Sequence, residues 1–258
     1  MNLATKRKRT QQAGLKRGIS LLLVICMIMS FTPLGALAQT ATEADIIIPA
    51  SSVIVMDETE LIDEINAGTA VITLGTDVYV SGSNLVIPTG VDITLEGNFI
   101  LSRADNTTSG NFITIETGAG LTIDGVRIES PAGVTGLRGI LVDDGAALTL
   151  LDGNISGFDV SDAGGGVSVM GGTFEMYGGT ISGNAASSGG GIYIESGSFE
   201  MYGGTISGNT AGGGGGLWVT DSGLLDTVVF TMWGGEISGN TASDHGGGVY
   251  YVGRCNQQ

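Results

Sequence analysis

A block that begins with three glycines recurs along the second half of this 258-residue chain. Its copies start at Gly164, Gly189, Gly214 and Gly246, so they lie 25, 25 and 32 residues apart. The second copy reads GGGIYIESGSFEMYGGTISGN, and the first differs from it at only a few positions. A fixed period of this length is typical of solenoids, in which each repeat buries its apolar side by stacking on its neighbours. The period therefore predicts a β-solenoid with one coil per repeat.

Alternation of residue types inside the repeat predicts which side chains point inward. Successive side chains of a strand point to opposite faces, so equivalent inward residues stack on neighbouring coils about 4.8 Å apart. The predicted inward residues are Phe174, Met176, Phe199, Met201, Phe230, Met232, Val167, Val169, Ile192, Ile194, Leu217, Val219, Ile181, Ile206 and Ile237. Asn184, Asn209 and Asn240 follow at a corner, where we expect a left-handed conformation and a hydrogen-bonded asparagine ladder.

The preceding part of the chain holds shorter, less regular apolar runs bounded by Gly, Asn, Asp or Pro, which predict strands of earlier coils. A β-sandwich is an alternative for residues 70–130 taken alone. Because these runs share strand and turn lengths with the repeats, one continuous solenoid over residues 70–258 is favoured. The predicted strands are residues 70–74, 77–80, 85–87, 91–95, 112–115, 121–123, 126–128 and 139–142.

Residues 39–69 are expected to form a leading segment and an amphipathic helix. Asp57 is placed to be the N-cap, and Glu60 is placed to complete a capping box. Leu61, Ile62 and Ile65 share one face of that helix, and Gly68 can end it. A solenoid has an apolar end, so this helix is predicted to cap the N-terminal end.

Residues 1–38 have the composition of a secretory signal peptide cut before Gln39. Basic residues precede an apolar run over residues 19–31, and Ala36-Leu37-Ala38 supplies small residues for cleavage. A retained membrane anchor is the alternative. The apolar run of 13 residues is shorter than the roughly 20 that a spanning helix needs, so we expect secretion with no membrane insertion.

Loss of the leader would leave a strongly acidic chain. Six of the ten basic residues lie in the leader and none of the 26 acidic ones do, so the mature chain has a formal charge of −22 and no lysine. Nucleic acid and anionic membranes are therefore excluded as partners, because phosphate binding needs clustered cations. Cys26 lies in the leader and Cys255 is then alone, which rules out an intramolecular disulfide.

Two strands begin with the glycine-rich segments GGGIYI and GGGLWV, and each follows an asparagine-containing corner such as ISGNTA. They resemble right-handed parallel β-helix repeats of bacterial surface proteins, which have the architecture of the pectate-lyase-like superfamily. They are more distantly similar to the polymorphic outer-membrane adhesins, whose repeats pair GGA(I/L) with FxxN. The resemblance covers residues 139–252 well and residues 70–138 loosely. It implies an all-β, right-handed parallel β-helix and leaves the activity open.

Outward aromatic residues are the candidate binding residues. They form two registers, one with Tyr193, Trp218 and Tyr250 and the other with Tyr177, Tyr202 and Trp233. Rows of planar side chains can stack on sugar rings or anchor a surface ligand. The alternative is that they only stabilise neighbouring strands, at about 0.2–1 kcal/mol per pair.

Catalysis of the kind seen in pectin-degrading β-helices would need acidic and basic residues gathered in one groove. The candidates are Asp143, Asp144, Asp152, Arg127 and Arg138, and Asp244-His245-Gly246 superficially resembles a Gly-His-Gly element. Asp143-Asp144-Gly145 also reads as an ordinary turn, and an acidic protein would repel polygalacturonate. Catalysis is therefore the alternative and a non-catalytic role the leading hypothesis.

Glu175 and Glu200 are expected side by side on neighbouring coils, where like charges repel. They are either solvated or bridged by calcium, and solvation is favoured because this pair offers too few oxygen ligands. No other cofactor is expected.

Two further segments bear on function. The insertion at residues 222–229 is a candidate binding loop, although it can equally be neutral. After Gly246 the sequence stops where the next strand and corner are due, which predicts a fragment of a longer protein with its surface attachment downstream. The alternative is an end covered by a partner or by self-association, with Cys255 forming an intermolecular disulfide.

The sequence as a whole favours a secreted or surface-exposed shaft that binds a glycan or a host or matrix ligand.

Overall fold

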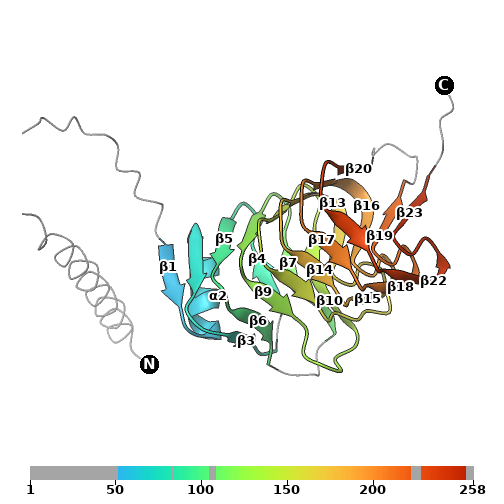
Figure 1. Cartoon of the computed structure of the whole chain (residues 1–258). Coiled ribbons are helices and arrows are strands. Elements are labelled where there is room, and N and C mark those ends of the chain that lie inside the picture. Colours follow the sequence, from blue (N-terminus) through green and yellow to red (C-terminus); the bar gives the residue numbers. More distant parts are fainter. Residues whose placement is uncertain (1–51, 83, 105–108, 222–227, 254–258) are drawn as a thin grey trace, which may run out of the picture. The chain divides into compact units, whose positions relative to one another are not determined.

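The computed structural model describes residues 52–82, 84–104, 109–221 and 228–253 (Figure 1). Within them the chain is an all-β parallel solenoid with one helix, as the glycine repeat predicts. The predicted signal peptide, the insertion from Ser222 and Cys255 lie outside the described residues. No helix in the described part is long and apolar enough to span a membrane.

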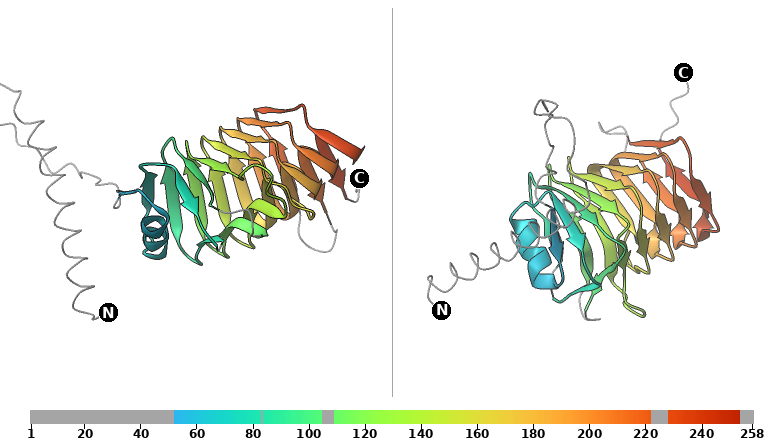
Figure 2. Two further views of the ribbon diagram at one scale, coloured as in Figure 1. Left: turned by 90° about the horizontal axis from the view of Figure 1, so that it is seen from below. Right: turned by 60° about the vertical axis from the view of Figure 1, so that its left-hand side comes forward.

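Each coil contributes strands to three faces, and neighbouring coils pair in parallel (Figure 2). Face 1 consists of β2 (Val71–Leu74), β5 (Asp92–Glu96), β8 (Gly120–Asp124), β11 (Ala147–Leu150), the second halves of β13 (Val167–Met176) and β16 (Ile192–Met201), and β20 (Val229–Met232). Face 2 consists of β3 (Val78–Val80), β6 (Ile100–Arg103), β9 (Arg127–Glu129), β12 (Asn154–Ser156), β14 (Thr180–Ser182), β17 (Thr205–Ser207) and β21 (Glu236–Ser238).

Face 3 returns the chain to the start of the next coil. It consists of β4 (Leu85–Ile87), β7 (Gly110–Ile115), β10 (Leu137–Val142), the first halves of β13 and β16, β19 (Leu217–Thr220) and β23 (Val249–Val252). In the later coils a short sheet of β15 (Ala185–Ser188), β18 (Thr210–Gly213) and β22 (Thr241–His245) lies between faces 2 and 3 along the chain. Strand β1 (Ser52–Val55) extends face 1 at its first end by pairing with β2.

The predicted inward residues form the core. Phe174 and Phe199 are fully buried and their rings stack with centroids 4.8 Å apart, close to the spacing between strands. Val167, Ile192 and Leu217 form a buried ladder on face 3 in the same way. The residues predicted to point inward are less buried in the last described coil, because no described coil covers it. Met232 there is 44% exposed.

The predicted asparagine ladder is confirmed, but the prediction that the asparagine itself takes the left-handed backbone conformation is wrong. Asn209 Oδ1 accepts hydrogen bonds from both the backbone N–H and Nδ2 of Asn184, each at 3.0 Å, and Asn240 does the same for Asn209. The residue in the left-handed conformation is the preceding glycine, with φ of +66° at Gly208. Glycine takes that conformation without steric cost, which frees the asparagine for buried hydrogen bonding.

Close contact between coils explains the three glycines. A Cβ atom at Gly190 would lie against the carbonyl oxygens of Thr210 and Gly215, and one at Gly191 would lie 2.6 Å from the carbonyl oxygen of Gly216. Only glycine therefore fits where the chain turns onto face 3. The repeat is a consequence of packing geometry.

Helix α2 (Glu58–Asn66) lies at the N-terminal end of the solenoid (Figure 2). Asp57 is its N-cap and accepts from the backbone N–H of Glu60 at 2.9 Å, as predicted. The Glu60 carboxylate accepts from the N–H of Met56, one residue before the N–H of a standard capping box. Leu61 and Ile65 are buried, whereas Ile62 is 37% exposed and does not share their buried face.

Candidate ligand-binding surfaces

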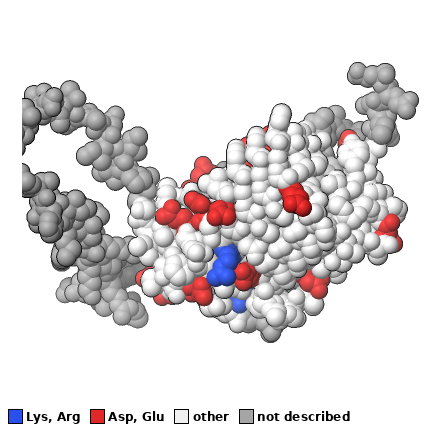
Figure 3. Space-filling model, in the orientation of Figure 1, with Lys and Arg blue, Asp and Glu red and all other residues white. Residues whose placement is uncertain are grey.

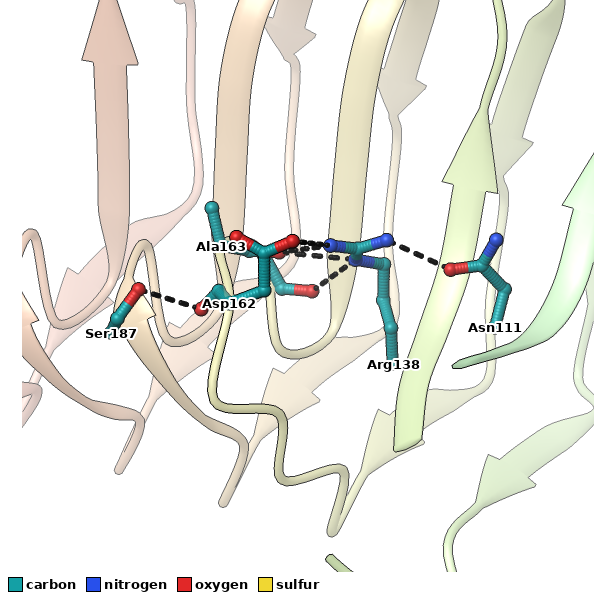
Figure 4. Close-up of polar contacts among 6 residues, drawn as sticks. Asn111, Arg138, Asp162, Ala163 and Ser187 are labelled. Atoms are coloured by element: carbon teal, nitrogen blue, oxygen red, sulfur yellow. Dashed lines mark hydrogen bonds and ion pairs between the residues drawn. The ribbon is translucent and has the colours of Figure 1, made fainter. Parts of the chain in front are cut away.

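Arg138 on β10 connects three successive coils (Figure 4). Its Nη1 donates to Asn111 Oδ1 at 2.8 Å on one side, and its Nη2 donates to the Ala163 carbonyl oxygen at 2.8 Å on the other. The Asp162 carboxylate lies 3.6 Å from Nη2. Burial lowers the pKa of Arg138, and Asp162 partly opposes that effect. With a side chain only 15% exposed, Arg138 is occupied in fastening the segment before β13 to the earlier coils.

The candidate catalytic residues lie at different corners. Asp143 and Asp144 occupy the turn between β10 and β11, whereas Asp152 occupies the turn between β11 and β12 and accepts from the N–H of Gly153 at 2.8 Å. The intervening strand has four residues, which separates the two turns by about 13 Å. None of the three aspartates is among the hydrogen-bond or ion-pair partners of Arg138.

Arg127 belongs to a third environment. It lies on face 2 and forms an ion pair of 3.8 Å with Glu129 on the same strand. Among the described residues, the hydrogen bonds and ion pairs of the candidate catalytic residues therefore do not gather them into one site.

Asp143 is the candidate acidic residue with a raised pKa. Burial raises the pKa of its carboxyl, and the charge of Glu116 raises it further. Glu116 accepts hydrogen bonds from the backbone N–H and the hydroxyl of Thr89, at 3.0 and 3.2 Å. A raised pKa is a property of acid catalysts, but stacked carboxylates in a solenoid produce the same shift without any substrate.

The row of Tyr177, Tyr202 and Trp233 directly follows the ends of three face 1 strands and is exposed. The rings of Tyr177 and Tyr202 are nearly parallel, at 6°, with centroids 4.7 Å apart. Each ring therefore covers one face of the other, and those two faces are not available to a sugar. Trp233, at 70% exposed, has the most open ring of the row. The geometry supports strand stabilisation for the tyrosine pair and leaves the Trp233 ring exposed.

The row of Tyr193, Trp218 and Tyr250 on face 3 is half-buried. The Trp218 ring packs on Gly213, where any Cβ would collide with it. Tyr250 contacts Trp218 with ring centroids 4.6 Å apart and contacts His245 at 5.0 Å. These rings fill a corner of the fold, so His245 belongs to an aromatic cluster.

Glu175 and Glu200 pair across neighbouring strands, as predicted. The Tyr202 hydroxyl donates to Glu200 Oε2 at 2.7 Å, and Trp233 Nε1 donates to the same atom at 3.4 Å. Tyr177 donates to Glu175 at 3.4 Å. Hydrogen-bond donors thus lie beside both carboxylates, which eases their mutual repulsion. The described residues hold no group of three or more His, Cys, Asp or Glu side chains suited to a metal ion.

The hydrogen bond between Tyr202 and Glu200 predicts a pH dependence. It is the main reason that the pKa of Tyr202 is raised from 10.0 to about 12. Since the raised pKa favours the neutral phenol in the folded state, this stabilisation is complete below pH 10 and is lost as the pH rises to about 12. Titration of phenolate absorbance should show this late tyrosine, and Tyr202→Phe should remove it.

The two glutamates supply a matched pair of variants for this titration. Glu200→Ala should return the pKa of Tyr202 towards 10, whereas Glu175→Ala should leave it high, because Glu175 is the weakest of its causes. Identical titration curves for the wild type and Glu200→Ala would show that the hydrogen bond does not form.

A groove of about 500 Å³ crosses face 1 over the earlier coils, and the sequence analysis missed it. Thr94, Thr122 and Thr149 stand at the same register position on β5, β8 and β11. Small residues at Gly120 and Ala147 leave space beside this threonine row. The signal was present in the sequence as a threonine between apolar residues in ITL, LTI and LTL, at intervals of 28 and 27 residues.

Charge on the surface is mostly negative. In Figure 3 acidic residues are spread over the visible face and basic residues are confined to a small area. The groove follows this pattern, since Asp92 lines it and no Lys or Arg does. No protein-family model, curated protein or solved structure matches this chain.

Proposed function

We propose that this chain is a non-catalytic β-solenoid shaft of a secreted or cell-surface protein, which holds a glycan or other surface ligand against its outward faces. The proposal rests on the structural roles of the residues that recur in the repeat. These residues form the inward ladders, the Asn184–Asn209–Asn240 hydrogen bonds and the glycine contacts between coils. The outward positions of the strands are not used by these contacts, so a ligand would bind there.

The extracellular location rests on the sequence. Residues 1–38 have the basic, apolar and small-residue regions of a signal peptide, and a mature chain without lysine suits an extracellular surface that does not bind nucleic acid. Peptide sequencing of the secreted protein should give an N-terminus at Gln39. An intact Met1 would contradict secretion by this route.

Polysaccharide cleavage is the alternative function. It draws support from the raised pKa of Asp143. The test is release of reducing or unsaturated ends from polygalacturonate and from neutral polysaccharides by the purified mature chain. We expect no release above background from the wild type. Release that is abolished by Asp143→Asn or Asp144→Ala, and retained in Asp152→Ala, would replace the shaft by an enzyme.

A further inference from the structure

We propose that the groove across β2, β5, β8 and β11 is a binding site for a linear polysaccharide that carries no negative charge. This inference rests on the proposed ligand-binding role of the outward faces, and it names the site and the class of ligand. The site is distinct from the aromatic rows, because none of the six aromatic candidates lines the groove.

The floor of the groove supplies hydroxyl groups without protein partners. Thr94, Thr122 and Thr149 have no side-chain hydrogen bond among the described residues, whereas the hydroxyl of Thr73 on the same face is held by Glu96 at 2.6 Å. Parallel pairing places the three hydroxyls about 4.8 Å apart along the solenoid. A row of unpaired donors and acceptors at a regular spacing fits an extended ligand with its own regular hydroxyl groups.

The shape of the groove follows from its small residues. Gly120 has no side chain, and a Cβ there would lie 2.6 Å from Asp92 Oδ1, so the carboxylate of Asp92 lies against the backbone of β8. Ala147 continues the depression onto β11. The volume of about 500 Å³ is within the usual range for binding clefts, and its apolar lining at Ala70 and Val71 suits the apolar faces of sugar rings.

Charge selects the kind of polysaccharide. Asp92 is the only charged residue in the groove lining, and Glu96 and Asp124 stand at neighbouring outward register positions on the same strands. The register continues through Thr149 to Glu175 and Glu200, so a ligand that extends along face 1 meets further carboxylates. Uronate or sulfate groups would be repelled along this whole path, whereas neutral or amino sugars would not.

The test is binding of three oligosaccharides of equal length to the mature chain, measured by calorimetry. Cellohexaose is the neutral probe, deacetylated chitohexaose the cationic probe and hexagalacturonate the anionic probe. We expect the neutral or the cationic probe to bind at least about tenfold more tightly than the anionic one. Thr122→Val removes one hydroxyl at constant shape and should weaken binding by about 3–10-fold. Ala147→Leu fills the groove and should weaken it by about tenfold or more.

Controls separate this site from the rest of the surface. Thr205→Val makes the same change at a half-buried outward threonine on face 2 and should leave binding unchanged. Valine is favoured in strands, so the threonine variants should keep the unfolding temperature of the wild type. Trp233→Ala reports on the aromatic row, outside the groove.

Three results would overturn the inference. Binding lost in Trp233→Ala but unchanged in both groove variants would leave the proposed function standing and remove the groove. Tighter binding of hexagalacturonate than of the other two probes would show the wrong ligand class. Failure of all three oligosaccharides to bind the wild type would remove both the groove site and the glycan-binding role of the shaft.

Discussion

Replacement of Asn209 by alanine should lower the free energy of unfolding by about 3 kcal/mol or more. Asn209 is fully buried, and its side chain makes four hydrogen bonds. Two come from Asn184, and two go to the carbonyl oxygen of Ile181 and to Oδ1 of Asn240. Alanine would leave several buried polar groups without partners, each at a cost of about 1–3 kcal/mol. Urea unfolding monitored by circular dichroism measures the change.

Asn240 provides the matched control for this ladder. It occupies the same corner of the last described coil and is half-buried, so water can enter where its side chain is removed and reach the groups of Asn209 and Ile206 that lose their partner in Asn240→Ala. We expect a loss of about 1 kcal/mol, clearly smaller than that at Asn209. Equal losses at the two positions would show that the ladder contributes through local corner geometry and that burial of its hydrogen bonds adds nothing.

The regular part of the solenoid could be predicted because its physical causes are local and repeated. Alternation in the FEM and GGG segments assigned Phe174, Phe199, Ile192 and Leu217 to the core, where the structure places them. In the earlier coils the strands β6, β11 and β12 were not predicted. All three are short, and β6 and β12 also contain Ser, Asn or Arg, so they become strands only because adjacent coils offer paired edges on both sides.

Contacts between segments that are far apart in the sequence could not be predicted from it. Arg138 was a candidate for chemistry because it and the candidate aspartates fall on consecutive early coils, but its partners Asn111 and Ala163 lie 27 and 25 residues away in the sequence. For the Tyr177 and Tyr202 rings the sequence left strand stabilisation and ligand binding open, because outward register is compatible with both. Loop lengths set which coils meet, and the repeat period constrains those lengths only after Gly164.

The groove was missed for a different reason. Its threonine row is ordinary residue by residue, and threonine is common in exposed strand positions. It becomes noticeable only when Thr94, Thr122 and Thr149 are aligned by strand register beside small neighbours. Alignment of a sequence on its own predicted coils would have revealed the row, but the irregular spacing of the earlier coils left that register open.

Phe199→Ala should be the most destabilising single change in the aromatic ladder, at about 3–5 kcal/mol. Its ring is fully buried between those of Phe174 and Phe230, with centroid separations of 4.8 and 5.4 Å. Removal leaves a cavity that the two neighbouring coils cannot close, because hydrogen bonding fixes their spacing. Thermal or urea unfolding of the mature chain measures the loss.

Phe230→Ala is the control, since it makes the same change in the last described coil. Phe230 is half-buried and stacks on Phe199 alone among the described rings, so its loss should cost about half as much. Stability in a solenoid is carried by contacts between neighbouring coils, and an interior coil has two such interfaces where an end coil has one. If Phe230→Ala proved as costly as Phe199→Ala, a further element would have to cover the last coil in solution.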